Sequence, residues 1–166
     1  MLQKGIENDE LFREFAPLLA PMGITIVDVG RTEHGRTSSV SIIIKTDDHE
    51  VTIDDCAKVY NLVYPRLELK TGDRDLQLEV STPGLQRNLH DVYEFGLFVG
   101  RRVRLYDLTR SAWVSGIISR VDDSSVALDD TTVEDRTENL GTCVVPYEQI
   151  QKAKLDYRWE DVPDVQ

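Results

Sequence analysis

The sequence has few of the residues that redox, metal or disulfide chemistry requires. Among its 166 residues there are only two cysteines and three histidines. Cys56 and Cys143 lie far apart, and neither has a second cysteine or a histidine at metal-ligand spacing, so we expect both to be small buried hydrophobic side chains. The sequence contains no Gly-rich phosphate loop, paired-histidine zinc motif or nucleophile elbow, so we expect no enzyme activity, no cofactor and no metal.

Long apolar runs are also missing. No segment approaches the roughly 20 consecutive apolar residues that a membrane-spanning helix needs. The first residues carry one lysine and no apolar segment, which does not fit a signal peptide. Hydrophobic residues still make up 40% of the chain, which is enough for a packed core. We therefore expect a cytoplasmic protein that does not bind membranes.

Net positive charge is the third feature that the sequence lacks. It has 19 basic and 30 acidic residues, which gives a formal net charge of −11. Neither half is basic, since residues 1–90 hold 10 basic and 15 acidic side chains and residues 91–166 hold 9 and 15. Any contact with RNA must therefore come from a local basic patch. The overall acidity favours a basic protein surface as a partner.

The first apolar pattern predicts a helix. Its stripe contains Leu11, Phe15, Leu18 and Leu19, at offsets of four, seven and eight residues. Pro17 lies inside the stripe, so we expect a kink there or two short helical turns. The β-branched segments 24–29 and 40–44 follow and predict two strands. We expect a hairpin whose loop residues are Arg31, His34 and Arg36.

A second helix is expected from residue 53. Thr52 and Asp55 have the spacing of a capping box, with the acid three residues after the hydroxyl. The apolar positions at helical spacing are Ile53, Ala57, Tyr60 and Leu67, with Cys56 and Val63 alongside. Pro65 predicts a bend, and the alternation at residues 76–80 predicts a half-buried strand. Residues 1–90 therefore predict an α+β domain with the order helix, strand, strand, helix, strand.

The rest of the chain has mainly the pattern of short strands. A short helix is expected at 92–95, and strands are expected at 103–105, 113–121, 126–128, 143–145 and 153–155. Gly116 predicts a bend or bulge in the long strand, and residues 147–151 predict one tight helical turn. The polar, acidic stretch 129–139 predicts a loop. Five short strands favour a small SH3-like or Sm-like β-barrel.

These patterns predict two domains. We assign residues 1–90 to the α+β domain, 91–98 to a connector and 99–158 to the barrel. Residues 159–166 form an acidic tail for which we expect disorder.

A strand that leaves its sheet through a Pro-Gly turn is the most informative local feature. Pro83 has a fixed φ, and Gly84 can take a positive φ. The hydroxyls of Ser81 and Thr82, together with the Arg87 guanidinium, have the chemistry to contact phosphate oxygens. The alternative is that the turn only ends one domain and orients the next.

Residues 78–89 resemble the signature of the RimP family, which usually reads L-E-V-S-S-P-G-x-D-R-P-L. The matching positions are Leu78, Glu79, Val80, Ser81, Pro83, Gly84, Arg87 and Leu89. The chain departs from this pattern at Thr82, Gln86 and Asn88. Segments 23–29, 51–56 and 98–103 also resemble parts of the family in the same order.

This resemblance implies a two-domain cytoplasmic factor without catalytic activity. Such a factor binds the immature small ribosomal subunit and assists its late assembly, by contacting ribosomal RNA and a basic ribosomal protein near the decoding region. We expect a monomer with no small-molecule substrate.

Arg101, Arg102 and Arg104 form the densest basic cluster. Arg102 and Arg104 alternate with apolar residues, so we expect them on one strand face, either contacting RNA phosphate or simply solvated. Tyr106 and Trp113 can stack on bases, but packing inside the barrel is the expected use. The rival functions are an Sm-like module for other RNAs and an acidic protein–protein adaptor, with an unrecognised hydrolase least favoured.

Overall fold

The computed structural model describes residues 2–72, 75–134, 136 and 139–158. Two compact units are present. The N-terminal unit is Ile6–Pro83, and the C-terminal unit combines Met1–Gly5 with Gly84–Gln166. The tail predicted at 159–166 lies outside the described residues. Within those residues, no helix is both long and apolar enough to cross a membrane.

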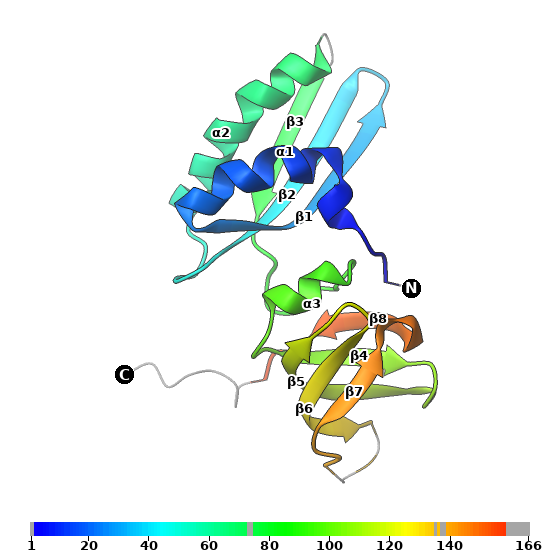
Figure 1. Ribbon diagram of the computed structural model, residues 1–166. Helices are drawn as coiled ribbons and strands as arrows, with labels where there is room; N and C mark the ends of the chain where they lie inside the picture. The colour runs from blue at the N-terminus through cyan, green and yellow to red at the C-terminus, as the bar shows by residue number, and fades with distance from the viewer. Residues whose placement is uncertain (1, 73–74, 135, 137–138, 159–166) are drawn as a thin grey trace. The chain divides into compact units, whose positions relative to one another are not determined.

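The N-terminal unit is a mixed α+β structure, and the predicted order of its elements is confirmed. The elements are η1 (Ile6–Asn8), α1 (Glu10–Leu19), η2 (Ala20–Met22), β1 (Ile24–His34), β2 (Thr37–Thr46), α2 (Ile53–Thr71) and β3 (Asp75–Ser81). Helices α1 and α2 lie on the same face of the three-stranded sheet (Figure 1).

The sheet has the strand order β1-β2-β3. β1 and β2 form an antiparallel hairpin, whereas β3 runs parallel to β2. A parallel pair needs a long crossover connection, and α2 provides it. Val40, Ile42 and Ile44 on β2 are buried beneath the helices. Ser41 points to the opposite face, which is open, so the sheet has the one-sided burial of a two-layer fold.

Helix α1 differs from its prediction in the stripe that it buries. Asp9 caps its N-terminus by accepting hydrogen bonds from the backbone amides of Leu11 and Phe12. The helix continues through Pro17 to residue 19. Leu18 is 38% exposed, so its predicted place in the buried stripe is wrong, and Phe12 occupies the core instead. Leu18 and Leu19 lie seven and eight residues after Leu11, so they fall on opposite edges of the apolar stripe. The helix is turned so that the Leu19 edge faces the core and the Leu18 edge faces outward.

Helix α2 has the predicted capping box at Thr52 and Asp55. Its predicted apolar stripe is confirmed at Val63 and Leu67, which are buried, and wrong at Ile53, which is 88% exposed, and at Tyr60, which is exposed as well. The residues that face the core repeat every four positions and are Asp55, Val59, Val63 and Leu67. The helix carries apolar side chains on two stripes, and only contact with the sheet decides which one is buried.

The hairpin is longer than predicted. β1 extends to His34, so Gly35 and Arg36 alone form the turn. Arg31 lies in the strand, where its Nη2 atom is 3.5 Å from a carboxylate oxygen of Asp9. The prediction that Arg31 and His34 belong to the loop is therefore wrong, because strand pairing continues to the last possible residue.

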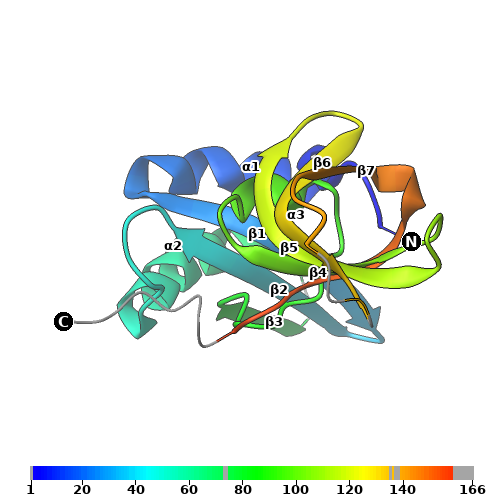
Figure 2. The same cartoon turned by 90° about the horizontal axis from the view of Figure 1, so that it is seen from below.

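The described residues of the C-terminal unit form one short helix and five strands. They are α3 (Tyr93–Leu97), β4 (Arg102–Asp107), β5 (Ala112–Val121), β6 (Ser125–Val133), β7 (Cys143–Pro146) and β8 (Ile150–Leu155), with the turn η3 (Tyr147–Gln149) before β8. The strand order is β7-β6-β5-β4-β8, and β5 and β6 are strongly curved (Figure 2). Because β7 and β8 do not pair with each other among the described residues, a closed barrel is not confirmed. β6 also extends to Val133, which corrects the predicted loop at 129–139.

Both cysteines were predicted to be buried, but both are only half-buried. Cys56 follows the helix cap, at the edge of the buried stripe of α2. Desolvation of its thiol, followed by the nearby charge of Asp55, raises its pKa above the ordinary value. This direction favours the unreactive thiol over the thiolate.

Gly116 marks the bulge that its sequence position predicted. The register between β5 and β6 shifts between Ser115 and Ile117. A Cβ atom on Gly116 would lie 2.9 Å from the Cβ of Leu128 and 3.0 Å from the carbonyl oxygen of Asp129. Only glycine therefore allows β6 to approach β5 this closely.

Gly116→Ala is expected to lower the free energy of unfolding by about 1–3 kcal/mol, because the new methyl group overpacks the contact with β6. Urea denaturation followed by circular dichroism measures this change. Gly96→Ala in α3 is the matched control, since its Cβ would meet only a methyl group at 3.5 Å. If the two variants unfold at the same urea concentration, the close contact at Gly116 does not require glycine.

Candidate functional site

The eight residues predicted to bind the ribosome fall into two groups. Ser81, Thr82 and Pro83 end the N-terminal unit, with Thr82 exposed. The other group belongs to the C-terminal unit and contains Gly84, Arg87, Arg101, Arg102 and Arg104. Each group is therefore described within its own unit.

The turn at the start of the C-terminal unit has the predicted backbone. Gly84 has a φ of +75°, in the left-handed region that favours glycine. The chain then runs along the free edge of β8. There the amide of Leu155 donates to the carbonyl of Arg87 at 2.9 Å, and the amide of Leu89 donates to the carbonyl of Ala153 at 2.8 Å. Residues 87–89 thus protect the outer edge of β8 in the manner of a short additional strand.

Arg87 is buried, with a side chain only 6% exposed. Its Nε atom donates to Oε1 of Glu94, whose side chain is fully buried. The other carboxylate oxygen of Glu94 accepts from the amide of His90 at 2.7 Å and from that of Asp91 at 3.1 Å. This ion pair joins the segment after the Pro-Gly turn, which carries Arg87, to helix α3, which carries Glu94. A contact between Arg87 and the ribosome stays a prediction, and the structure shows the side chain buried in an ion pair with Glu94.

The three arginines at the start of the five-stranded sheet lie at the surface. Arg101 is exposed, and its guanidinium lies 6.0 Å from the ring centroid of Phe98. In β4, burial alternates strictly, so that Val103 and Leu105 face the core. Arg102 and Arg104 therefore share the outer face of the strand, which is the arrangement that the alternation predicted.

Strand register brings further basic and aromatic side chains to this outer face. Residues directly opposite each other in an antiparallel pair point to the same side. Arg104 lies opposite Lys154 of β8, and Tyr106 lies opposite Lys152 of β8 and Trp113 of β5. We call this surface the basic–aromatic face; it consists of Arg102, Arg104, Tyr106, Trp113, Lys152, Lys154 and Arg158.

The two aromatic rings of this face contact each other. Tyr106 and Trp113 meet edge to face, with ring centroids 5.5 Å apart. The guanidinium of Arg104 lies over the indole of Trp113 at 4.6 Å from its centroid and also donates to Glu134 at 2.8 Å. Both rings are half-buried on the outer side of the sheet, so the prediction that they pack inside a barrel is wrong.

A groove of about 360 Å³ opens beside Trp113. Among the residues that line it are Arg104, Trp113, Ser115, Glu134, Asp156 and Arg158. The hydroxyl of Ser115 donates a hydrogen bond to the Asp156 carboxylate at 3.2 Å. The same oxygen accepts one from the Arg158 guanidinium, also at 3.2 Å. We call this feature the Trp113 groove. It combines an aromatic wall with hydrogen-bond donors and acceptors.

Sequence reasoning missed most of the basic–aromatic face. Lys152, Lys154 and Arg158 lie about 50 residues after Arg102 and Arg104 in the sequence, and only the pairing of β8 with β4 brings them together. The available signal was the alternation of the two lysines around Ala153. Its partner strand could not be identified from local pattern alone.

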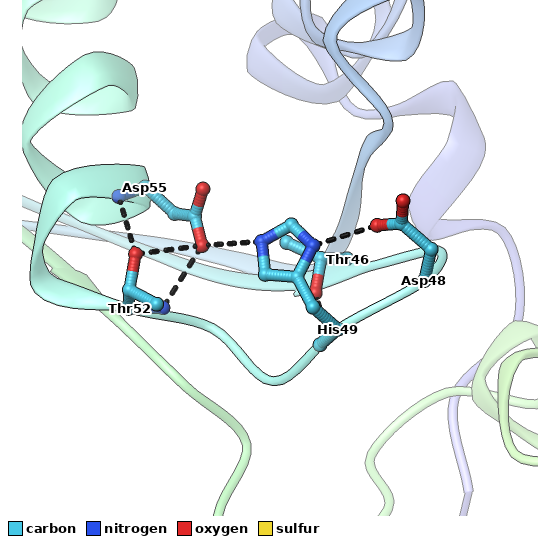
Figure 3. A network of polar contacts seen from close by, with 5 residues as sticks. All are labelled: Thr46, Asp48, His49, Thr52 and Asp55. Atoms are coloured by element: carbon cyan, nitrogen blue, oxygen red, sulfur yellow. Dashed lines mark hydrogen bonds and ion pairs between the residues drawn. The ribbon is translucent and has the colours of Figure 1, made fainter.

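A second polar cluster lies in the N-terminal unit, before α2 (Figure 3). The two ring nitrogens of His49 lie 2.6 Å from a carboxylate oxygen of Asp48 and 2.8 Å from one of Asp55. The backbone carbonyl of His49 accepts a hydrogen bond from the hydroxyl of Thr46. Because a ring that meets a carboxylate on each side donates from both nitrogens only when protonated, this arrangement favours the imidazolium.

These contacts shift two pKa values in opposite directions. The hydrogen bond with Asp48, and then that with Asp55, raise the pKa of His49 above its ordinary value. The backbone amide of Thr52, followed by His49, lowers the pKa of Asp55 to about 2. The cluster thus connects the loop before α2, through His49, to the capping residue Asp55, and we interpret its role as structural.

The His49 contribution to stability is expected to depend on pH. Since the folded pKa is raised, the contribution is complete below the unfolded value of about 6.5 and is lost as the pH rises through the folded pKa. His49→Gln should therefore lower the urea midpoint at about pH 5.5 and have little effect at about pH 9. His34→Gln, at the exposed end of β1, is the control. An equal loss at both pH values would contradict this assignment.

Comparison with known proteins identifies the N-terminal half of the chain. Residues 14–86 match the family model for the RimP N-terminal domain. Part of the chain is also similar to an SmAP (LSm) protein from Methanococcus vannielii, with a TM-score of 0.35, 23% identity and coverage of 39% of this chain and 92% of the other. A heptameric archaeal Sm protein gives a TM-score of 0.35, 20% identity and coverage of 39% and 98%.

Proposed function

The chain belongs to the RimP family, and from this premise we propose that it is a maturation factor that binds the immature small ribosomal subunit and assists its late assembly. The match over residues 14–86 carries the proposal, because it spans most of the N-terminal unit. The proposed partners are ribosomal RNA and a basic ribosomal protein near the decoding region. The factor acts in the cytoplasm as a monomer and catalyses no reaction.

The charge distribution supports two kinds of partner. The net charge of −11 favours approach to basic ribosomal proteins. Against this acidic background, the basic–aromatic face gathers five of the chain's 19 basic residues on one side of one sheet. A local patch of this kind is what binding to an RNA backbone requires.

The proposed mechanism is binding alone. A factor that binds one conformation of a particle better than its competitors shifts the population toward that conformation, by no more than the difference between the two binding free energies. We propose that residues 1–90 and 99–158 act as two linked binding domains. Linkage makes the second contact intramolecular and so strengthens the complex without any new contact.

The residues proposed to contact the subunit are those predicted from the sequence. They are Ser81, Thr82, Pro83, Gly84, Arg87, Arg101, Arg102 and Arg104. Among them, the arginines of β4 have the most direct support, since they lie on the outer face beside other basic side chains. The buried pairing of Arg87 with Glu94 supports an indirect contribution, in which Arg87 orders the turn.

Co-sedimentation with separated ribosomal subunits tests the proposed function. The purified protein is expected to migrate with the small subunit, to saturate, and to be released progressively as salt rises. Migration with the large subunit alone, or with neither subunit, would contradict the proposal. Binding to ribosomal proteins without salt-sensitive binding to RNA would instead support the acidic adaptor.

A further inference from the structure

We propose that the Trp113 groove binds one unpaired nucleotide of an RNA strand. This inference rests on the proposed function and specifies how the C-terminal unit engages RNA. The groove has a volume of about 360 Å³, within the range of sites that hold small ligands. It lies on the face of the sheet that carries the basic cluster, so a base in the groove has its phosphates beside cationic side chains.

The wall of the groove is suited to a planar base. Trp113 and Arg104 line the groove, and the guanidinium lies on the indole at 4.6 Å from its centroid. Tyr106 is outside the lining and packs edge to face against Trp113. Unpaired bases stack both on aromatic rings and on guanidinium planes. Base stacking on an aromatic side chain tolerates any sequence, since every base has a π-face. The groove therefore favours a flipped or single-stranded nucleotide over a base pair.

The polar side of the groove matches the edges of a nucleotide. Ser115 can both donate and accept a hydrogen bond, and the Arg158 guanidinium next to it donates. The carboxylates of Asp156 and Glu134 accept. A base edge or a 2′-hydroxyl also presents donors and acceptors together, so both kinds of protein group find partners.

The cations around the groove are placed for the sugar-phosphate backbone. Arg102 and Arg104 are two residues apart on β4, and on β8 Lys154 lies opposite Arg104 and Lys152 lies opposite Tyr106. Residues two apart in a strand are separated by roughly 7 Å, so the cations form a row along the two strands, in which Arg104 pairs with Glu134. A basic ribosomal protein would be repelled by this row. The face therefore fits RNA better than it fits a protein partner.

Glu134 is one of two carboxylates in the groove, together with Asp156, whose negative charge opposes RNA in the unbound protein. Its carboxylate pairs with Arg104, and both side chains are substantially exposed. Exposed pairs of this kind are weak, so a phosphate can replace the carboxylate at small cost. Glu134→Gln removes a negative charge near the polyanion and is expected to strengthen RNA binding about twofold to threefold.

Tryptophan fluorescence tests the groove directly. In the full chain carrying Trp159→Phe, Trp113 is the only indole. Single-stranded RNA of about ten nucleotides should quench its emission saturably, and duplex RNA of the same sequence should not. Anisotropy of labelled RNA should show about tenfold weaker binding for Tyr106→Ala, for Trp113→Ala and for Arg104→Glu. Tyr106→Phe and Trp113→Phe should restore most of the affinity while keeping the fold.

The controls separate this inference from the proposed function. Arg120→Glu, at the exposed far end of β5, should bind RNA like the parent protein. RNA binding that leaves Trp113 unquenched and is unchanged in Trp113→Ala overturns the groove. If the protein also co-sediments with small subunits in that case, the inference fails and the proposed function stands. Quenching by a basic ribosomal peptide without quenching by RNA overturns the inference in favour of a protein ligand.

Discussion

Arg87→Ala is expected to lower the free energy of unfolding of the C-terminal unit by about 3–5 kcal/mol. The guanidinium pairs with a carboxylate on Glu94 that is fully buried. Removing the cation leaves this carboxylate buried, where it still accepts from the amides of His90 and Asp91. Breaking a buried ion pair from one side is costly, because the remaining charge loses the paired cation and gains little water in return.

Urea denaturation of the full chain measures this loss, with Arg120→Ala as the control. Arg120 is exposed, so its removal should change the unfolding free energy by less than about 0.5 kcal/mol. Because Arg87 and Glu94 act as a pair, the double variant with Arg87→Ala and Glu94→Ala should lose less than the sum of the two single losses. An unchanged urea midpoint in Arg87→Ala would show that the pair does not hold this unit together.

The second large effect is expected from reversing two charges on the basic–aromatic face. Arg102→Glu combined with Arg104→Glu should weaken small-subunit binding about hundredfold, if each arginine contributes about 1.5 kcal/mol through a charged hydrogen bond. The salt dependence should also become shallower, since fewer counterions are released on binding. Both side chains lie on the outer face of β4, so the core beneath them stays intact.

A variant with the same change in net charge distinguishes a local patch from long-range repulsion. Arg66→Glu combined with Arg120→Glu changes exposed residues on α2 and β5 that are not members of this face. It should retain most of the subunit affinity. If the two double variants weaken binding equally, the effect comes from net charge and the proposed role of Arg102 and Arg104 is wrong.

Local pattern predicted most of the elements, because their signals lie within a few residues. The capping box at Thr52 and Asp55 and the bulge at Gly116 are each set by neighbouring chemistry. The strict alternation at Arg102 and Arg104 likewise placed both side chains on one face. Such features depend on backbone geometry over one turn or one strand.

The features that local pattern did not predict depend on contacts between residues far apart in the sequence. Leu18 and Ile53 fit a helical period, yet both are exposed because the helices bury another stripe against the sheet. The Arg87 guanidinium has the chemistry of a phosphate ligand, but in the fold it is buried and pairs with Glu94. The Trp113 groove depends on residues from three strands and on the segment after β8, whose register no local pattern specifies.

The departure of this chain from the family motif at Asn88 has a simple structural explanation. Along β8, the carbonyl of Arg87 and the amide of Leu89 form the hydrogen bonds. Asn88 lies opposite Lys154 in an isolated bridge, so its own amide is not used in this pairing. Asparagine and the family's usual proline therefore fit the same position, since proline lacks only that amide.

The most direct test of the account is a binding competition between immature and mature small ribosomal subunits. A factor that promotes assembly by binding must prefer the state that it stabilises. We therefore expect the immature particle to bind at least about tenfold more tightly, which corresponds to about 1.4 kcal/mol of differential binding. Equal affinity for the two particles would contradict the proposed mechanism, because such a ligand cannot shift the equilibrium between them.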